Sequence, residues 1–380
     1  MSKIILKLKL ESMALGGEAV SSHEGKKIFV PWGVEGDTVI AEIFEDKKDY
    51  ARAKILEVLE ESPHRTKAPC PYFFKCGGCQ WQHIRYESQV AFKQKLLLSA
   101  LQRTGKIENP ILKAPILATK TLHYRSKIRL QLSKKGKLGF YQPHSREVVE
   151  IDSCAIADEK LNEKISKAKQ LGMQLLAQNA AKSHDIEINL HNDKVKLVAD
   201  EEDESVFSQA NSSQNEILKE KVLEYLNLQG KEKLLELFAG DGNFSFYLAS
   251  HLSQITAVES SPQAIVCAEE KSTKKHVRNI DWIESTAHRY LATLPKQAPF
   301  DRVLLDPPRM GFSQGIEALA ALKAPLIVYV SCDPATMARD VKDLMMKGYR
   351  HEFSQLIDMF PQTYHIESIN VLSFTKEVES

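Results

Sequence analysis

From about residue 207 onward, short apolar runs alternate with helical stretches, and this pattern constrains the fold more than any other feature of the chain. The runs LLELFAG, ITAVE, RVLLD and LIVYV mostly end in, or run into, a polar residue. Such runs are typical of parallel strands buried on both faces of a sheet. The tail HEFSQLIDMFPQTYHIESINVLSF offers two more strands and no helix. We therefore predict a parallel α/β domain over residues 206–380, with an antiparallel hairpin at its edge.

Short strands dominate the first 62 residues. KIILKLKLESMA, KKIFVPWGV and DTVIAEIFED carry β-branched and aromatic residues in near alternation, and ARAKILEVLEES supplies a last strand. Four or five strands in about 60 residues predict a small barrel of the oligonucleotide-binding kind. Because this segment is slightly acidic, a role as a spacer stays open.

The middle of the chain, residues 63–205, combines helices with strands. A basic helical stretch at about residues 87–105 follows a cysteine cluster, and strand-like segments and a polar helix at about residues 158–179 come next. The segment IEINLHNDKVKLVAD predicts a hairpin. The acidic run at residues 200–204 then marks the expected boundary to the α/β domain.

A glycine turn opens the α/β domain. Gly240 and Gly242 in LLELFAGDGNFSF let the backbone approach a ligand closely, and the helix that follows favours polar groups at its N-terminus. Glu259 ends the next strand, where a carboxylate suits the hydroxyls of a ribose. Because the third glycine of the dinucleotide fingerprint is missing, the pattern favours S-adenosylmethionine over a dinucleotide. A turn that binds no nucleotide is the alternative.

Two further predicted strands end in chemically distinctive residues. Asp306 begins the segment DPPRMGF, in which two prolines stiffen the chain as it leaves the strand. Cys332 follows LIVYV in the segment SCDPATM. Open α/β sheets place their sites at the carboxyl ends of the strands, and a thiol beside a helix N-terminus can act as a nucleophile. We therefore expect Asp306 and Cys332 at one site, with a structural cysteine as the alternative.

Three of the six cysteines lie within ten residues, in CPYFFKCGGC. Cys70, Cys76 and Cys79 can turn toward one metal centre, and Cys154 is the candidate fourth ligand. Four thiolates fit either zinc or an iron–sulfur cluster, and the spacing alone favours neither. Unliganded buried thiols are the remaining alternative.

The charge of the chain is unevenly distributed. The net charge is +1, yet residues 65–150 carry 17 basic and 4 acidic side chains, a net charge of +13. Such asymmetry favours a polyanionic partner for this segment, with a solvated basic face as the alternative. Candidate phosphate contacts are Arg125, Lys127, Arg129, Lys134, Lys135 and Lys137. Candidate base-stacking residues, with core packing as the alternative, are Tyr124, Phe140 and Tyr141.

The apolar segments are short throughout the chain. No run reaches the roughly 18 apolar residues that a membrane-spanning helix needs. The start MSKIILKLKL lacks the apolar core of a signal peptide. We therefore expect a cytoplasmic protein, in which a disulfide framework is not expected, and a monomer as the simplest assembly.

Several motifs together resemble one family. CGGC with an upstream cysteine, FSQANSSQNE, ELFAGDGNFS, LLDPPRMG, VSCDPATMARD and HIES are similar to the motifs of RNA uracil-C5 methyltransferases. The resemblance covers nearly the whole chain and is greatest to the branch that acts on 23S ribosomal RNA. That branch carries an N-terminal TRAM barrel, a four-iron–four-sulfur cluster and a Rossmann-like domain that binds S-adenosylmethionine. The bacterial tRNA branch typically lacks the barrel and the cluster cysteines.

The resemblance implies a role for most candidate residues. It favours iron–sulfur over zinc at the four cysteines, makes Cys332 the nucleophile and makes Glu367 the base that accepts a proton. It also implies that helical residues of about 82–114 pack on the catalytic domain, and that a cofactor contact lies near Thr286. Together with Gly240 of the glycine turn, the expected cofactor contacts are Gln209, Phe238, Asn243, Glu259 and Asp306.

The chain is thus predicted to be an enzyme of class EC 2.1.1 that forms 5-methyluridine in RNA, with 23S ribosomal RNA as the expected substrate. The alternatives are a tRNA uracil-C5 methyltransferase, a cytosine-C5 methyltransferase and a catalytically inactive iron–sulfur RNA-binding protein. The presence of Cys332, Glu367 and Asp306 counts against an inactive protein.

Overall fold

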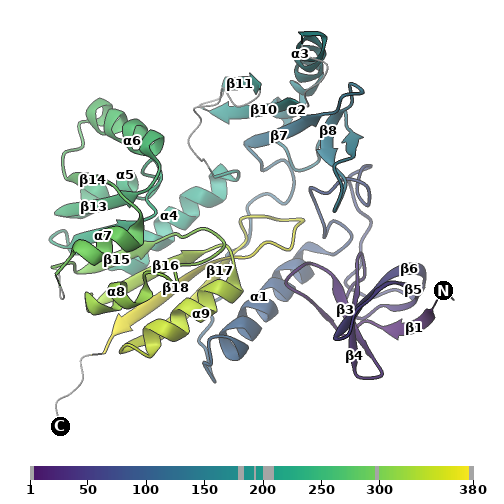
Figure 1. Ribbon diagram of the computed structural model, residues 1–380, viewed down its shortest axis with the longest axis horizontal. Helices are drawn as coiled ribbons and strands as arrows, with labels where there is room; N and C mark the ends of the chain where they lie inside the picture. The colour runs from purple at the N-terminus through teal and green to yellow at the C-terminus, as the bar shows by residue number, and fades with distance from the viewer. Residues whose placement is uncertain (1–3, 179–183, 192–193, 200–208, 296–298, 376–380) are drawn as a thin grey trace.

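Three β-sheets follow one another along the chain (Figure 1). The computed structural model describes residues 4–178, 184–191, 194–199, 209–295 and 299–375, and the structural statements below refer to these residues. The predicted acidic boundary at residues 200–204 lies outside them. No helix in the described ranges has the length and apolar character needed to cross a membrane.

The N-terminal sheet contains six strands in the order β1-β5-β6-β4-β3-β2. They are β1 (Ile5–Lys9), β2 (Ser12–Met13), β3 (Ala19–His23), β4 (Lys26–Val30), β5 (Thr38–Asp46) and β6 (Tyr50–Glu60). Register shifts along the β5–β6 pair bend the sheet around its own apolar core. The sequence predicted four or five strands and did not indicate β2, because β2 has only two residues and shows no alternation.

The middle sheet is antiparallel, in the order β11-β10-β7-β8-β9. Its strands are β7 (Lys127–Leu132), β8 (Leu138–Tyr141), β9 (Val148–Glu150), β10 (His184–His191) and β11 (Lys194–Ala199). The single helix predicted at residues 158–179 is two helices, α2 (Glu159–Asn162) and α3 (Ile165–Gln178). The side chain of Asn162, at the break, accepts a hydrogen bond from the backbone nitrogen of Cys154 (2.8 Å) and donates one to its carbonyl (3.1 Å).

The C-terminal sheet has the order β14-β13-β12-β15-β16-β18-β17. Five strands are parallel, β18 is antiparallel to β16, and β17 pairs with β18. The predicted parallel α/β domain with an antiparallel edge hairpin is confirmed. Its strands are β12 (Lys233–Leu237), β13 (Gln254–Glu259), β14 (Ile280–Glu284), β15 (Arg302–Leu305), β16 (Leu326–Ser331), β17 (Tyr349–Ile357) and β18 (Glu367–Phe374).

Helices cover both faces of this sheet (Figure 1). One apolar cluster joins a face of the sheet to α1, α7, α8 and α9, and a second joins the other face to α4 and α5. The strand order reverses between β12 and β15, which makes the carboxyl ends of these strands the place for a site. The helices are α1 (Tyr86–Arg103), α4 (Ser212–Leu226), α5 (Ser245–Leu248), α6 (Pro262–Lys275), α7 (Ala287–Thr293), α8 (Ile316–Ala321) and α9 (Pro334–Met345).

Helix α1 lies between the N-terminal sheet and the α/β domain (Figure 1). Leu97 and Leu101 are fully buried in a core cluster of the α/β domain, whereas Phe92 packs in the core of the N-terminal sheet. The same helix carries Lys93, which forms a fully buried ion pair with Asp358 (Nζ to Oδ1, 2.7 Å).

The β17–β18 loop (residues 358–366) is anchored by residues from distant parts of the chain. The carbonyl oxygens of residues 359, 360 and 361 accept hydrogen bonds from the side chains of Asn211 (3.0 Å), Lys93 (3.0 Å) and Tyr124 (3.1 Å). Because Glu367 follows this loop directly, these contacts fix the approach of the chain to the carboxyl edge of the sheet.

Candidate active site

Three predicted site residues meet at the carboxyl edge of the C-terminal sheet. Asp306 follows β15, Cys332 follows β16, and Glu367 begins the antiparallel strand β18. The last paired residues of β16 and β18 are Ser331 and Ser368. Cys332 and Glu367 are the next residues on their strands beyond this pair and therefore occupy facing positions.

Burial is the largest influence on the pKa values of these three groups. Burial raises the pKa of the Cys332 thiol to about 11, with further contributions from Glu367 and Asp306 and an opposing one from Arg309. Burial also raises the pKa of Asp306 to about 7, and it raises that of Glu367 well above its ordinary value, with Asp306 adding to the effect. The site therefore holds more acidic groups than it can ionise at once, and a cation would favour their charged forms.

Arg309 is a member of this site that the sequence alone left without a role. Its side chain is exposed, and Nη2 donates to Nδ1 of His365 (3.3 Å), a residue of the β17–β18 loop. Burial, followed by Arg309, lowers the pKa of His365 to about 4, so the imidazole is neutral and can accept this bond. The position of Arg309 in the Asp-Pro-Pro-Arg segment was the available signal.

The chain turns sharply after Cys332 into α9. The Asp333 carboxylate accepts hydrogen bonds from the backbone nitrogens of Ala335 and Thr336 (both 3.0 Å), and Pro334 occupies the first turn. This capping arrangement fixes the helix start immediately beside the thiol.

A cavity of about 210 Å³ lies beside the glycine turn. Phe238, Glu259, Thr286 and Phe312 contribute to its wall. Glu259 is held in place because its carboxylate accepts hydrogen bonds from the backbone nitrogens of Gly240 (3.0 Å) and of residues 260 and 261 (both 2.7 Å). The buried hydroxyl of Thr286 has no hydrogen-bond partner and is available to a ligand.

The backbone at the glycine turn and just before it is in the left-handed region. Phe238 has φ = +63° and Gly240 has φ = +58°. The Phe238 ring stacks edge-on against Phe312, with 5.2 Å between ring centroids, and so forms one wall of the cavity. A Cβ atom at Gly240 would meet no neighbour, so glycine is favoured there by the backbone conformation and not by space.

The other expected cofactor contacts lie outside this cavity. Asn243 exchanges two hydrogen bonds with Asn215 of α4 (2.8 and 3.1 Å). Gln209 is partly buried, and its neighbour Ala210 accepts a hydrogen bond from the backbone nitrogen of Ser126 (2.8 Å). The cavity thus brings together Phe238 and Glu259, whereas Asp306, Asn243 and Gln209 are not among its lining residues.

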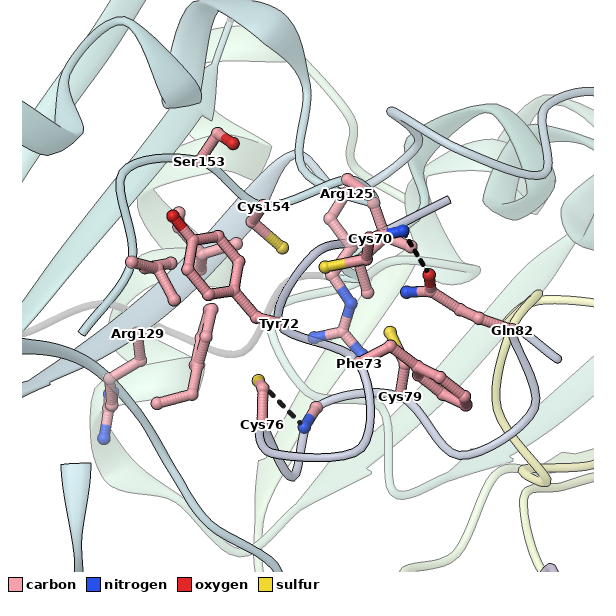
Figure 2. A pocket seen from close by; sticks show the side chains of 16 residues that line it. Cys70, Tyr72, Phe73, Cys76, Cys79, Gln82, Arg125, Arg129, Ser153 and Cys154 are labelled. Atoms are coloured by element: carbon pink, nitrogen blue, oxygen red, sulfur yellow. Dashed lines mark hydrogen bonds between the residues drawn. The ribbon is translucent and has the colours of Figure 1, made fainter. Parts of the chain in front are cut away.

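The four cysteines of the expected metal centre surround a second cavity, of about 270 Å³. Figure 2 shows the side chains of Cys70, Cys76, Cys79 and Cys154 around this space, which aromatic and aliphatic side chains also line. Burial raises the pKa of Cys76 to about 11 and that of Cys79 to about 12. In the described part of the chain, no three His, Cys, Asp or Glu side chains are grouped to hold a metal ion.

The candidate RNA contacts of the basic segment differ in their exposure to solvent and in their partners. Arg125 lines the cysteine cavity, so its assignment as a phosphate contact is wrong. Tyr124 is buried and donates to a backbone carbonyl, so it is a core residue and not a stacking platform. Lys127 and Arg129 pair with Glu187 (2.7 and 3.3 Å). Three lysines are exposed in or beside the turn between β7 and β8, namely Lys134, Lys135 and Lys137.

The parallel sheet, the glycine turn, the acid at the end of β13 and the cavity between them define the architecture of an S-adenosylmethionine-dependent methyltransferase. The family described as tRNA (Uracil-5-)-methyltransferase matches residues 157–375. The chain belongs to this family of RNA uracil-C5 methyltransferases, as its motifs predicted.

Known relatives are similar over nearly their whole length. An uncharacterized RNA methyltransferase of Bdellovibrio bacteriovorus is 34% identical over 96% of this chain and 94% of its own. A 23S rRNA (uracil(1939)-C(5))-methyltransferase of Shewanella woodyi is 29% identical over 93% of this chain and 92% of its own. The crystal structure of Pyrococcus abyssi tRNA (uracil-54, C5)-methyltransferase with S-adenosyl-L-homocysteine has the same fold, with a TM-score of 0.74, 23% identity and 96% and 99% of the two chains covered.

Proposed function

We propose that this protein transfers a methyl group from S-adenosylmethionine to carbon 5 of a uridine in 23S ribosomal RNA. The observation that carries the proposal is the facing pair of Cys332 and Glu367 at the carboxyl edge of the sheet. The choice of ribosomal RNA is supported by the similarity to the Shewanella woodyi enzyme over nearly the whole chain.

The reaction needs a nucleophile and a base at adjacent ring atoms. Carbon 5 of uracil is a poor nucleophile, but addition of the Cys332 thiolate to carbon 6 places electron density on carbon 5, which can then take the methyl group. Removal of the carbon 5 proton allows the carbon–sulfur bond to break, so that the thiolate leaves and the ring double bond returns. Glu367 accepts that proton, because its carboxylate is the base that faces Cys332.

The cofactor supplies the electrophilic methyl group. We assign its ribose to Glu259, whose carboxylate the turn around Gly240 already orients, and its adenine to the cavity bounded by Phe238 and Thr286. Asp306 lies close enough to interact electrostatically with Cys332 and would stabilise a cationic sulfonium. Gln209 and Asn243 complete the proposed contacts from the side of α4.

We assign the four cysteines to a four-iron–four-sulfur cluster. The donor set is four sulfurs around a partly open, mostly apolar cavity. Because the sulfurs line a cavity of about 270 Å³ and do not converge on a single ion position, the site suits a group of several atoms better than one zinc ion. The cluster would hold the segment of Cys70–Cys79 against the loop of Cys154, and no step of methyl transfer is assigned to it.

Entry of the target uridine requires that its base leave the stack. Flipping a base costs a few kcal/mol, least in single-stranded RNA, and contacts to the backbone phosphates offset that cost. The exposed lysines of the β7–β8 turn are the candidates for these contacts.

We also propose that the chain consists of three domains, with boundaries at about residues 62 and 205.

The proposal is tested with a Cys332→Ala variant, labelled cofactor and two unmodified transcripts, a 23S ribosomal RNA fragment and a tRNA. The unmodified protein should label the ribosomal transcript and yield 5-methyluridine, whereas the variant should bind the RNA with unchanged affinity and transfer no methyl group. Labelling of tRNA alone would replace the substrate, 5-methylcytosine would replace the base, and full activity of the variant would overturn the mechanism.

A further inference from the structure

Arg125 has a position that its sequence context did not indicate. It lines the cavity of the four cysteines, and Figure 2 shows it among their side chains. Its Nε atom is buried without a hydrogen-bond partner. Among the described residues, no carboxylate forms an ion pair with it. The charged group therefore faces a cavity that contains no compensating anion from the protein, and such burial is costly.

The sulfurs of Cys79 and Cys154 lie in the wall of the same cavity as the Arg125 side chain (Figure 2). Arg125 also interacts electrostatically with Tyr124 and with His365. Because a cation in this wall favours negative charge in the cavity, and no carboxylate of the described residues pairs with it, an anionic group in the cavity would complete the site.

We infer that Arg125 is the counter-charge of the iron–sulfur cluster, a positioning residue that stabilises its anionic state. This inference rests on the proposed cluster at the four cysteines. A cluster held by four thiolates is anionic and becomes more so on reduction, and its reduction potential depends on nearby charge and on hydrogen bonds to its sulfurs. A fixed cation in the wall of the cavity therefore raises the potential and slows the loss of the cluster.

The backbone around Arg125 holds the cation in this place. Its nitrogen donates to the carbonyl of Ile156 (2.8 Å), and its carbonyl accepts from the nitrogen of Asp158 (2.9 Å). Both partners belong to the loop that carries Cys154. The next residue, Ser126, donates to Ala210 on the opposite side (2.8 Å). Arg125 is thus joined to the ligand loop and does not have to be recruited when a cluster is bound.

Arg129 provides a matched control, because it lines the same cavity but differs in its surroundings. Its side chain is 56% exposed, and it pairs with Glu187 at 3.3 Å. Its charge is therefore screened by water and partly offset by Glu187, which it shares with Lys127, so its removal should change the cluster little.

The test compares Arg125→Gln, Arg125→Lys and Arg129→Gln in the full chain after anaerobic reconstitution with iron and sulfide. Redox titration followed by visible absorbance should show a more negative potential for Arg125→Gln, a nearly unchanged one for Arg125→Lys, and a small shift for Arg129→Gln. With an iron chelator present, the Arg125→Gln cluster should be lost several-fold faster than that of the unmodified protein.

The outcomes separate this inference from the proposed ligand set. A potential for Arg125→Gln that equals that of the unmodified protein, or that shifts no more than for Arg129→Gln, overturns the counter-charge role. If Arg125→Gln takes up no cluster, uptake by Arg125→Lys supports the requirement for a cation, and failure of both variants overturns it. If the unmodified protein itself forms no cluster, the assignment of the four cysteines fails, and the inference fails with it, while the Cys332 mechanism remains testable on its own.

Discussion

Cys332 and Glu367 occupy facing positions on two adjacent antiparallel strands, one residue beyond the paired residues Ser331 and Ser368. Carbon 6 and carbon 5 of uracil are neighbouring ring atoms, so the group that adds to one and the group that deprotonates the other have to lie close together. The crossing of β18 back between β16 and β17 provides this proximity, because it brings the start of a late strand to the carboxyl edge of an earlier one.

Replacement of the base should trap the reaction after methyl transfer. In a Glu367→Gln variant the carbon 5 proton has no acceptor, so the methylated RNA should stay bonded to Cys332 and turnover should fall by about 10²–10⁴-fold. A denaturing gel should show a slowly migrating protein–RNA band that carries the labelled methyl group. The double variant Cys332→Ala/Glu367→Gln is the control and should show no band. Rapid turnover of Glu367→Gln without an adduct would exclude Glu367 as the base.

The thiol of the free enzyme should react slowly at neutral pH. Since burial and the neighbouring carboxyl groups raise the pKa of Cys332 to about 11, only a small fraction is thiolate at neutral pH, and that fraction grows about tenfold per pH unit below the pKa. Iodoacetamide should therefore alkylate this cysteine about tenfold faster per pH unit, as measured by mass spectrometry. The Glu367→Gln variant should shift the midpoint of this pH dependence to lower pH, because Glu367 contributes to the raised pKa of Cys332. A rate that levels off near pH 8 would contradict this assignment.

The buried pair of Lys93 and Asp358 should be a major contributor to the connection between α1 and the β17–β18 loop. Lys93→Met leaves a fully buried carboxylate without its partner and should lower the free energy of unfolding by about 3–5 kcal/mol. Lys95→Met on the same helix is the matched control, because Lys95 pairs with Glu35 at 2.7 Å but is 62% exposed, and its loss should cost about 1 kcal/mol or less. Chemical denaturation followed by circular dichroism measures both changes in the free energy of unfolding. Equal changes for the two variants would show that the buried pair stabilises the protein no more than the exposed pair.

Much of the α/β domain could be predicted because local patterns determine it. The strands β12, β13, β15 and β16 are mostly buried and therefore appear as apolar runs, and the rule that sites form at carboxyl ends then groups Asp306 with Cys332. The facing position of Glu367 could not be derived from any pattern, since it depends on the pairing of β18 with β16, and only the motif HIES suggested it.

The predictions that Arg125 and Tyr124 contact RNA failed for a common reason. Arg125 belongs to a basic segment and Tyr124 is its neighbour, so sequence reasoning assigned both to RNA. Their surroundings come from residues far away along the chain, because Tyr124 bonds to the carbonyl of Pro361 and Arg125 to the loop of Cys154. A charge count records how many cations a segment has but not which of them face solvent.

The lysines that do face solvent should account for the salt dependence of RNA binding. Lys134, Lys135 and Lys137 are exposed around the β7–β8 turn, and each phosphate contact that is lost should reduce the slope of log affinity against log salt by roughly 1. Single alanine variants should therefore weaken binding most at low salt, as measured by filter binding at several ionic strengths. Lys274→Ala on α6 is the control, because this lysine is exposed but pairs with Glu270 at 3.3 Å. A flat salt dependence of the unmodified protein would assign RNA binding to the N-terminal sheet or to base stacking.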